Sequence, residues 1–577
     1  MKKLLLVFTC LCTLILSSSC TRKDASENVL NVPLTGEIST LDPANSYDTV
    51  SNSVVYQVYE QLFDYHYLRR PYQLQPLLAE DLPQVSDDGL TYTIKIKKEV
   101  PYHSDPAFKG ETRYLKAQDF ITQIKRLAWK PTNSNGWWLF DGKIAGINEF
   151  RDAAGDDFEK FKSLSISGVQ APDDHTLVIK LTEAYPQMMY ALAMGFTSPM
   201  PLEVLEEYGN DLSRHMVGTG PFYLKEVQAL SGVTIKKFEG YKNSTYPTKG
   251  DRVAHGNDML VDAGKSLPFL EEINFKIIKE DQTRWLNFRA GKIDLLVVPK
   301  DNFSTAVSAD GGLTDELKKE NVQLIIGPTL TYWWLEFNMS DTVVGGAKNL
   351  KLRKAISHAI DFDKYIEVFT NNVGQKANSI YPPGIPGYDP AKRLPYSYDL
   401  DAAKKLLAEA GFPEGKGLPV IKFDVRGTSA RNRQESQFIK SELAKIGIQV
   451  EVIMNTFPAF LEKARNGKLQ FWQGGWAMDY PDAENCLQLL VTRNHPPGPN
   501  SSYFSNPKFD ALFERLKVMS EGPDKWAIME QMEEIVHSEM PWVMQYYARN
   551  YILHQGRLKN FRHSDLIFNY FKYLKVQ

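Results

Sequence analysis

A strand–helix–strand succession in the last third of the chain constrains the fold more than any other segment. Residues 421–425 form a short strand-like run, 433–446 have helical periodicity ending at Gly447, and 448–453 form a second strand-like run. A helix between two strands of one sheet returns the chain so that the strands lie parallel. This order predicts an α/β domain with parallel strand pairing.

The same alternation of strands and helices continues along most of the chain. Strands are expected at residues 29–34 and at 90–96, the second after a hairpin-type turn at 87–89. Amphipathic helices are expected at residues 50–67, 116–129, 350–369 and 400–410. We find no internal repeat with a period of 20 to 50 residues, which argues against a solenoid or a propeller.

The first twenty residues have the features of an export signal. Lys2 and Lys3 precede a mostly apolar run at 4–16, which is too short to span a bilayer. Small residues then precede Cys20, and this arrangement resembles a bacterial lipobox, although Leu16 lies one position further upstream than usual. We therefore predict a signal peptide at 1–19, a lipid anchor on Cys20 and a polar tether at 20–28. An ordinary cleaved signal with a chance cysteine is the alternative.

Cysteine usage and charge agree with an exported protein. Three of the four cysteines lie in the first twenty residues, and Cys486 alone lies in the body of the protein, so no intramolecular disulfide is expected and stability must come from the core. The 577 residues suggest about two to four domains. A net charge of −3 favours neither nucleic acid nor an acidic membrane. Because no later apolar run reaches the length of a transmembrane helix, the lipid on Cys20 is the only membrane attachment expected.

The segment at 474–482, Gly-Gly-Trp-Ala-Met-Asp-Tyr-Pro-Asp, is the main candidate for a binding site. It places Trp476 and the carboxylates of Asp479 and Asp482 in a turn after a short apolar segment. No nucleophile, metal-ligand set or phosphate loop accompanies it, which suggests that it holds a cation rather than breaks a bond. The alternatives are that Asp479 bonds its own turn, that Asp482 is a turn residue and that Trp476 is a core residue.

Short motifs occur in a characteristic order along nearly all of the mature chain. They are Leu41-Asp42-Pro43, Tyr59-Glu60-Gln61-Leu62, Leu78-Ala79-Glu80, residues 86–92, 116–120, 218–222, 289–294, 353–356 and 359–361, followed by 476–482. Each motif is weak alone, but the shared order is specific. The chain resembles the oligopeptide- and dipeptide-binding proteins of ABC importers, the family 5 extracellular solute-binding proteins.

The resemblance implies an α/β fold of the two-lobed, periplasmic-binding-protein-like type, with an extra domain on the first lobe. Lobe I would hold residues 29–65, 165–335 and 545–577, the extra domain 66–164 and lobe II 336–544. The chain would cross between the lobes near 334–338 and 544–546.

The resemblance also implies a function and a set of site residues. The protein would capture a peptide between its lobes and deliver it to the permease subunits of an ABC importer, as a lipid-anchored monomer on the periplasmic side of the cell envelope, without enzymatic activity, cofactor or nucleic acid. Asp479 would meet the α-ammonium of the peptide, Trp476 would wall the pocket, and Glu60 would lie near the cleft. A solvated position on a helix is the alternative for Glu60.

Two departures from the family pattern limit the choice of ligand. Some family members have arginine where this chain has Gln473, and a neutral amide cannot neutralise a ligand carboxylate. Another group must therefore meet that carboxylate, or the ligand is not a simple short peptide. The polar stretch at 242–267 is expected to be a loop insertion.

Other functions are weighed against the same residues. An oligosaccharide, a cell-wall peptide or a metal chelate are alternative solutes, and an envelope hydrolase or chaperone is the alternative class. Ten histidines without a His-Glu-x-x-His motif or a cluster do not predict a zinc or nickel site. Neither a Gly-x-Ser-x-Gly motif nor a Walker loop is present.

Overall fold

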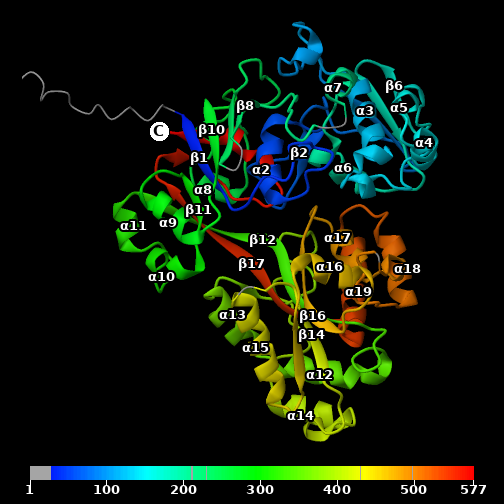
Figure 1. Ribbon diagram of the computed structural model, residues 1–577, viewed down its shortest axis with the longest axis vertical. Coiled ribbons are helices and arrows are strands. Elements are labelled where there is room, and N and C mark those ends of the chain that lie inside the picture. The colour runs from blue at the N-terminus through cyan, green and yellow to red at the C-terminus, as the bar shows by residue number, and fades with distance from the viewer. Residues whose placement is uncertain (1–27, 210–211, 229–230, 429, 497) are drawn as a thin grey trace, which may run out of the picture.

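The computed structural model describes residues 28–577, apart from 210–211, 229–230, 429 and 497, and folds into two lobes (Figure 1). The predicted signal peptide and Cys20 lie outside the described residues. None of the described helices is long and apolar enough to span a bilayer.

Lobe I is organised around a four-stranded sheet in the order β1-β10-β9-β8. Its strands are β1 (Val29–Leu34), β10 (Glu272–Ile277), β9 (Gly232–Lys237) and β8 (Phe222–Gln228). β1 pairs parallel with β10, and the other pairs are antiparallel. Alternate residues such as Leu30 and Ile273 are buried with Val54 of helix α2 (Thr49–Val58). Asp48 caps α2 by accepting from the Ser51 amide at 2.8 Å, so the helix begins at a defined point beside the sheet.

A side region of lobe I (residues 84–180) has a sheet of its own in the order β4-β5-β7-β6. Its strands are β4 (Gln84–Val85), β5 (Thr91–Lys95), β7 (Thr176–Lys180) and β6 (Val169–Asp173). Helix α3 (Ala117–Ala128) contacts β6 and β7. Because β6 and β7 belong to this sheet, it continues beyond the boundary expected at residue 164. A small hairpin of β2 (Phe63–Tyr65) and β3 (Leu74–Pro76) precedes it.

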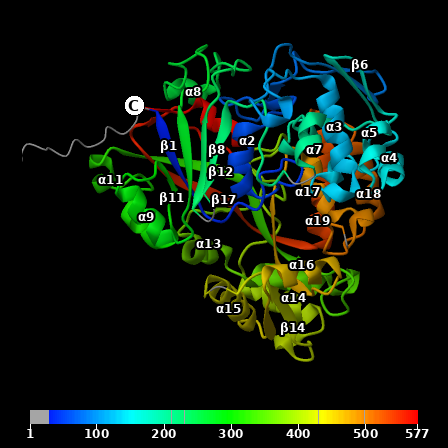
Figure 2. The ribbon, with the colours of Figure 1, turned by 45° about the horizontal axis from the view of Figure 1, so that its top comes forward.

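Two long antiparallel strands, β12 (Val322–Phe337) and β17 (Trp542–Gln555), connect the lobes (Figures 1 and 2). The crossing points expected at 334–338 and 544–546 overlap these strands. They are the centre of a seven-stranded sheet in the order β11-β17-β12-β16-β14-β15. The remaining strands of this sheet are β11 (Leu295–Val297), β16 (Phe471–Ala477), β14 (Ile421–Val425), β15 (Val450–Met454) and β13 (Gln375–Lys376), which pairs with β17.

Lobe II contains the predicted strand–helix–strand unit. β14 and β15 pair in parallel, and helix α15 (Ala430–Ala444) connects them, which confirms the prediction. The single helix expected at 350–369 is wrong, because the chain forms α12 (Leu350–Ala359) and α13 (Phe362–Thr370). Asp361 separates the two helices because it caps α13. The Asp361 carboxylate accepts from the Lys364 backbone amide at 2.9 Å.

The remaining helices cover the sheets of both lobes. In lobe I and the side region they are α4 (Ile147–Ala154), α5 (Phe158–Ser163), α6 (Met188–Ala191), α7 (Leu202–Tyr208), α8 (Arg252–Gly256), α9 (Asp281–Arg289), α10 (Phe303–Ala306) and α11 (Asp315–Lys319). In lobe II they are α14 (Leu400–Glu409), α16 (Phe457–Arg465), α17 (Ala483–Leu487), α18 (Pro507–Leu516) and α19 (Pro523–Glu539).

The polar stretch at 242–267 packs onto the C-terminal segment of the chain. Tyr246 is fully buried, Asp251 pairs with Arg562 at 2.6 Å, and Asp262 pairs with Lys575 at 2.6 Å. Two ion pairs and a buried ring attach this stretch to lobe I, so it is an integrated part of the lobe.

Candidate functional site

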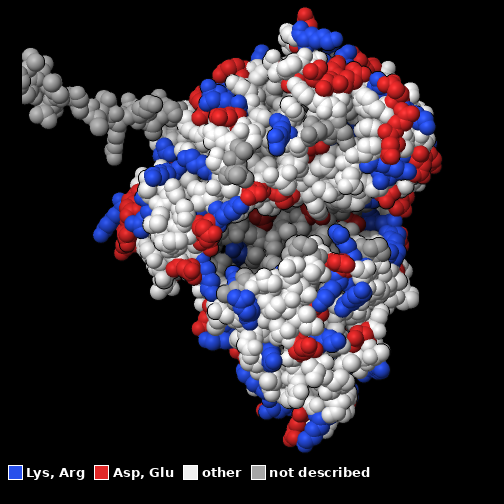
Figure 3. Space-filling model, viewed as in Figure 1, with Lys and Arg blue, Asp and Glu red and all other residues white. Residues whose placement is uncertain are grey.

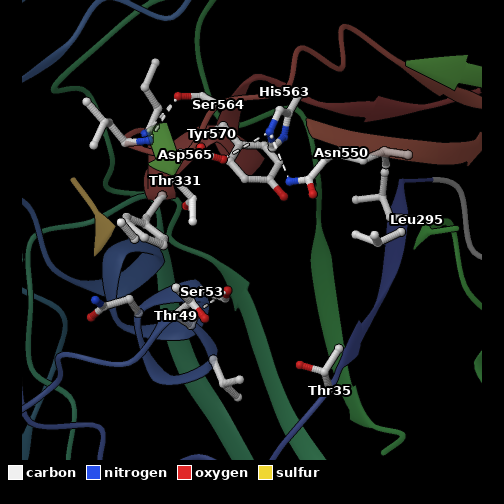
Figure 4. A pocket seen from close by; sticks show the side chains of 18 of the residues that line it. Thr35, Thr49, Ser53, Leu295, Thr331, Asn550, His563, Ser564, Asp565 and Tyr570 are labelled. Carbon is white, nitrogen blue, oxygen red and sulfur yellow. Dashed lines mark hydrogen bonds and ion pairs between the residues drawn. The ribbon is translucent and has the colours of Figure 1, made fainter. Parts of the chain in front are cut away.

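A cavity of about 910 Å³ lies between the lobes, where the surface is deeply hollowed (Figure 3). Lobe I contributes the end of β1, the region of α2, the β11 segment and residues 561–571. Lobe II contributes residues 476–479 and Arg431. Figure 4 shows side chains on this wall, among them Thr49 and Ser53 on α2 and His563 and Tyr570 from the C-terminal segment.

The turn at 478–481 is held by the elements on either side of it. β16 runs antiparallel to β12, with Trp476 opposite Tyr332, and ends at Ala477. α17 starts after Asp482, whose carboxylate accepts from the Glu484 amide at 2.8 Å. Asp482 also pairs with the buried Lys525 at 2.7 Å. These contacts fix Asp482 within lobe II, whereas Asp479 lines the cavity.

Asp479 lies on the cavity wall, partly buried, and is bonded through both carboxylate oxygens. Oδ1 accepts from the Tyr47 hydroxyl of lobe I at 2.8 Å, and Oδ2 accepts from the side-chain amide Nδ2 of Asn485 at 3.1 Å. Both donors are neutral, and among the described residues no lysine, arginine or histidine pairs with this carboxylate. Burial raises the pKa of Asp479, and the bonds from Asn485 and Tyr47 offset this only in part.

Trp476 also lies on the cavity wall and is fixed by the same asparagine. Its indole Nε1 donates to Asn485 Oδ1 at 2.9 Å, and the Asp479 amide donates to that oxygen at 3.1 Å. Asn485 is fully buried, so it holds Trp476 and Asp479 in one fixed arrangement. Tyr47 and Asn485 were not predicted from the sequence.

Glu60 does not line this cavity. It is 1% exposed inside lobe I, where its carboxylate accepts from the Tyr241 hydroxyl at 2.7 Å and the Asn243 amide at 2.5 Å. The Lys572 ammonium lies 4.0 Å away. Burial raises the pKa of Glu60, and Lys572 opposes that shift. The environment of Glu60 is therefore that of a buried structural carboxyl group.

Gln473 lies within lobe II, away from the main cavity wall. Its amide donates to the Tyr365 hydroxyl at 3.1 Å and to Gln545 Oε1 at 2.9 Å. It borders a separate hollow of about 20 Å³. The structure therefore brings Asp479 and Trp476 together at the cavity but places Glu60 and Gln473 elsewhere.

Comparisons with known proteins match this architecture. A family profile described as bacterial extracellular solute-binding proteins, family 5 Middle, matches residues 73–497. The chain belongs to this family. Its members are solute-binding proteins, which agrees with the resemblance seen in the sequence motifs.

Relatives of this family 5 protein match over most of their length. Heme-binding protein A of Haemophilus influenzae is 24% identical over 533 residues, which are 91% of this chain and 87% of that protein. The dipeptide-binding protein of Escherichia coli is 24% identical over 477 residues, 81% of this chain and 79% of that protein. The structure of the ABC transporter-associated periplasmic binding protein DppA from Helicobacter pylori, in complex with peptide STSA, has a TM-score of 0.73 at 24% identity and covers 95% of this chain and 98% of that chain. The predicted two-lobed α/β fold is confirmed.

Cationic side chains of this family 5 protein also reach the cavity wall. The Arg284 guanidinium is already bonded to Asp281 and to the Ile278 and Lys279 carbonyls. Arg431 of lobe II pairs with Glu435 at 2.7 Å but keeps a side chain that is 47% exposed. Lys300 of lobe I is also exposed. Arg431 and Lys300 are therefore the cations on this wall that are most available to a solute.

The lobes of this family 5 protein also touch outside the cavity. Lys517 of lobe II pairs with Glu183 of lobe I at 3.0 Å, and the rings of Tyr190 and Tyr480 stack 5.4 Å apart at 7°. Helices α17–α19 lie against the side region in both ribbon views (Figures 1 and 2). These contacts join the two lobes directly outside the cavity. Among the described residues, no group of three or more histidine, cysteine, aspartate or glutamate side chains could hold a metal ion.

Proposed function

We propose that this chain is an exported, lipid-anchored solute-binding protein that closes its lobes on a peptide and delivers it to the permease subunits of an ABC importer. Membership of family 5 supports solute capture outside the cytoplasm. The names of the dipeptide-binding relative and of the STSA complex support a peptide as the solute. We assign no catalytic role to any residue and expect the protein to act as a monomer.

The observation that carries the peptide proposal is the position of Asp479. A carboxylate in a closed cleft loses much of its hydration, and neutral donors compensate for only part of that loss. The α-ammonium of a peptide would supply the missing positive charge and form a charge-assisted hydrogen bond. Removing one partner of such a buried pair costs about 2–5 kcal/mol of binding free energy.

The rest of the wall suits the other parts of a peptide. Leu296, Ile552 and Phe571 are buried apolar residues on the lobe I side of the cavity. They would accept apolar side chains, at about 25 cal/mol per Å² of apolar surface removed from water. Arg431 of lobe II and Lys300 of lobe I would meet the peptide carboxylate. They would take the role of the arginine that some family members have at the position of Gln473.

Closure follows from contact with both lobes. A solute that touches Asp479 and Trp476 on lobe II and the α2 region on lobe I binds the closed form more tightly than the open form. The solute shifts the equilibrium from the open form to the closed form by no more than the difference between its affinities for the two forms. The Tyr47–Asp479 hydrogen bond joins the two lobes at this cavity. The proposed ammonium-binding site would therefore be complete only when the lobes meet.

Mass spectrometry of the solute released by denaturing the purified protein tests the proposal. A mixture of intact peptides with free amino termini is the expected result. A saccharide, a metal chelate or another non-peptide solute would overturn the peptide assignment. Incubation with a peptide library should return the peptides uncleaved, and turnover would instead support the hydrolase alternative.

A further inference from the structure

A second hollow, of about 330 Å³, opens on lobe I at the first described strand, away from the interlobe cavity. β1 contributes Val29 and Asn31 to its lining. Three cationic side chains also line it: Lys276 from β10, Lys292 after α9 and Arg557 after β17. Asn287 and Gly291 complete the lining. Parts of the chain far apart in sequence thus bring three positive charges to one concave surface.

Two of these cations are held in place by bonds within lobe I. The buried carboxylate of Asp294 accepts from Arg557 Nε at 2.8 Å, Arg557 Nη2 at 2.7 Å and the Asn31 amide at 2.8 Å. Lys276 Nζ donates to the Lys292 carbonyl at 3.0 Å. The guanidinium and one ammonium therefore have positions set by the fold.

The charge at this hollow is only partly compensated. Asp294 is 0% exposed and is used by Arg557, whereas no carboxylate among the described residues pairs with Lys276 or Lys292. Nearby lysines on lobe I differ, since Lys225 pairs with Glu272 at 2.9 Å and Lys237 with Glu271 at 3.0 Å. Burial lowers the pKa of Lys276, Asp294 opposes this, and Lys292 and Arg557 lower it further. An anion in the hollow would relieve that repulsion.

The donor set matches a phosphate group. Asp294 uses Nε and one N–H of Nη2, so the Nη1–Nη2 edge of Arg557 still presents two parallel N–H donors to phosphate oxygens. The two ammonium groups add compact positive charge. We infer that this hollow binds a phosphate group, and that in the anchored protein the phosphate belongs to an anionic lipid headgroup. The source of the phosphate rests on the proposed lipid at Cys20.

The position in the chain favours a lipid as the source. Cys20 precedes Val29 by nine residues, which span at most about 30 Å when extended at ~3.3–3.6 Å per residue. A lipid on Cys20 would therefore keep the hollow within about 30 Å of the membrane surface. A phosphate contact there would fix how lobe I stands on the membrane, in addition to the tether.

The test uses the purified lipoprotein with the pair Lys276→Gln/Lys292→Gln. The control pair is Lys404→Gln/Lys405→Gln, which removes the same charge from exposed positions of α14. Calorimetry in detergent micelles with glycerol 3-phosphate should show binding to the wild type and the control, and about tenfold or more weaker binding to the hollow variant. Equal binding in all three proteins, or none in the wild type, would overturn the site.

Hydrogen exchange on the lipoprotein in vesicles decides the source. Exchange at 29–31 and 287–292 should slow in phosphatidylcholine vesicles containing phosphatidylglycerol, relative to phosphatidylcholine alone, in the wild type and the control but not in the hollow variant. Glycerol 3-phosphate binding without this vesicle effect would overturn the lipid source. Intact mass reports acylation of Cys20 separately, and peptide binding by the hollow variant should be unchanged, so failure of the proposed function would be recognised independently.

Discussion

The Tyr47 hydroxyl donates a 2.8 Å hydrogen bond to the Asp479 carboxylate, so a residue just before α2 of lobe I meets the turn after β16 of lobe II. The bond joins the lobes at the wall of the cavity. Under the proposed function, it places Asp479 where solute binding and lobe closure would coincide.

Asp479→Asn should leave the empty protein about as stable as the wild type at neutral pH. Burial raises the pKa of Asp479 above its unfolded value, so the folded state binds the proton more tightly. The ionised carboxylate therefore opposes folding as pH rises through that pKa. The amide removes this effect, and the gain offsets the loss of the oxygen that accepts from the Asn485 side chain. Thermal unfolding of the empty protein at pH 7 checks this, and a midpoint several degrees lower would show that Asp479 is structural.

Peptide affinity should fall as pH is lowered through the pKa of Asp479 in the free protein. The ammonium binds the ionised carboxylate, and burial moves its protonation to higher pH than for an exposed aspartate. Below that pKa the ratio of wild-type to Asp479→Asn affinity should decrease about tenfold per pH unit, until it reaches one. Calorimetric titrations of both proteins with one peptide measure this ratio, and a constant ratio between pH 7 and 4 would contradict an ionised anchor.

Glu183→Gln should open the empty protein without touching the cavity wall. Lys517 is 6% exposed and loses its partner across the lobes, although Glu514 at 2.8 Å keeps it paired within lobe II. We expect a larger radius of gyration in small-angle scattering for the empty protein and up to about tenfold weaker peptide binding. The matched control is Glu159→Gln. It removes an ion pair with Lys162 at 2.8 Å that lies within the side region and does not connect the two lobes. Equal scattering for both variants would refute a role in closure.

Glu60→Gln should reduce stability while leaving peptide affinity unchanged. The carboxylate accepts from Tyr241 and Asn243, and an amide cannot accept through its nitrogen. A buried donor left unpaired costs about 1–3 kcal/mol of unfolding free energy. Chemical denaturation measures that loss. Weaker peptide binding with normal stability would instead return Glu60 to the site, as the sequence suggested.

The sequence predicted local elements better than the contacts between them. The strand at 421–425 matches β14, because a short apolar run beside a helix has few other solutions. The break at Asp361 was missed, since capping interrupted an otherwise continuous periodic pattern. Tyr47 could not be found, because it lies 432 residues from Asp479 and no local pattern marks a bond formed only when two lobes meet. Glu60 was expected within a helix at 50–67. That helix is too long, because α2 stops at Val58, and Glu60 is buried inside lobe I.

The central claim is that Asp479 neutralises the amino end of a bound peptide. Calorimetry with one peptide, free or N-acetylated, on the wild type and on Asp479→Asn tests it most directly. For the wild type, acetylation should weaken binding by about 2–5 kcal/mol, and for Asp479→Asn it should have almost no effect, because the two changes remove the same interaction. Equal penalties for acetylation in both proteins would contradict the claim.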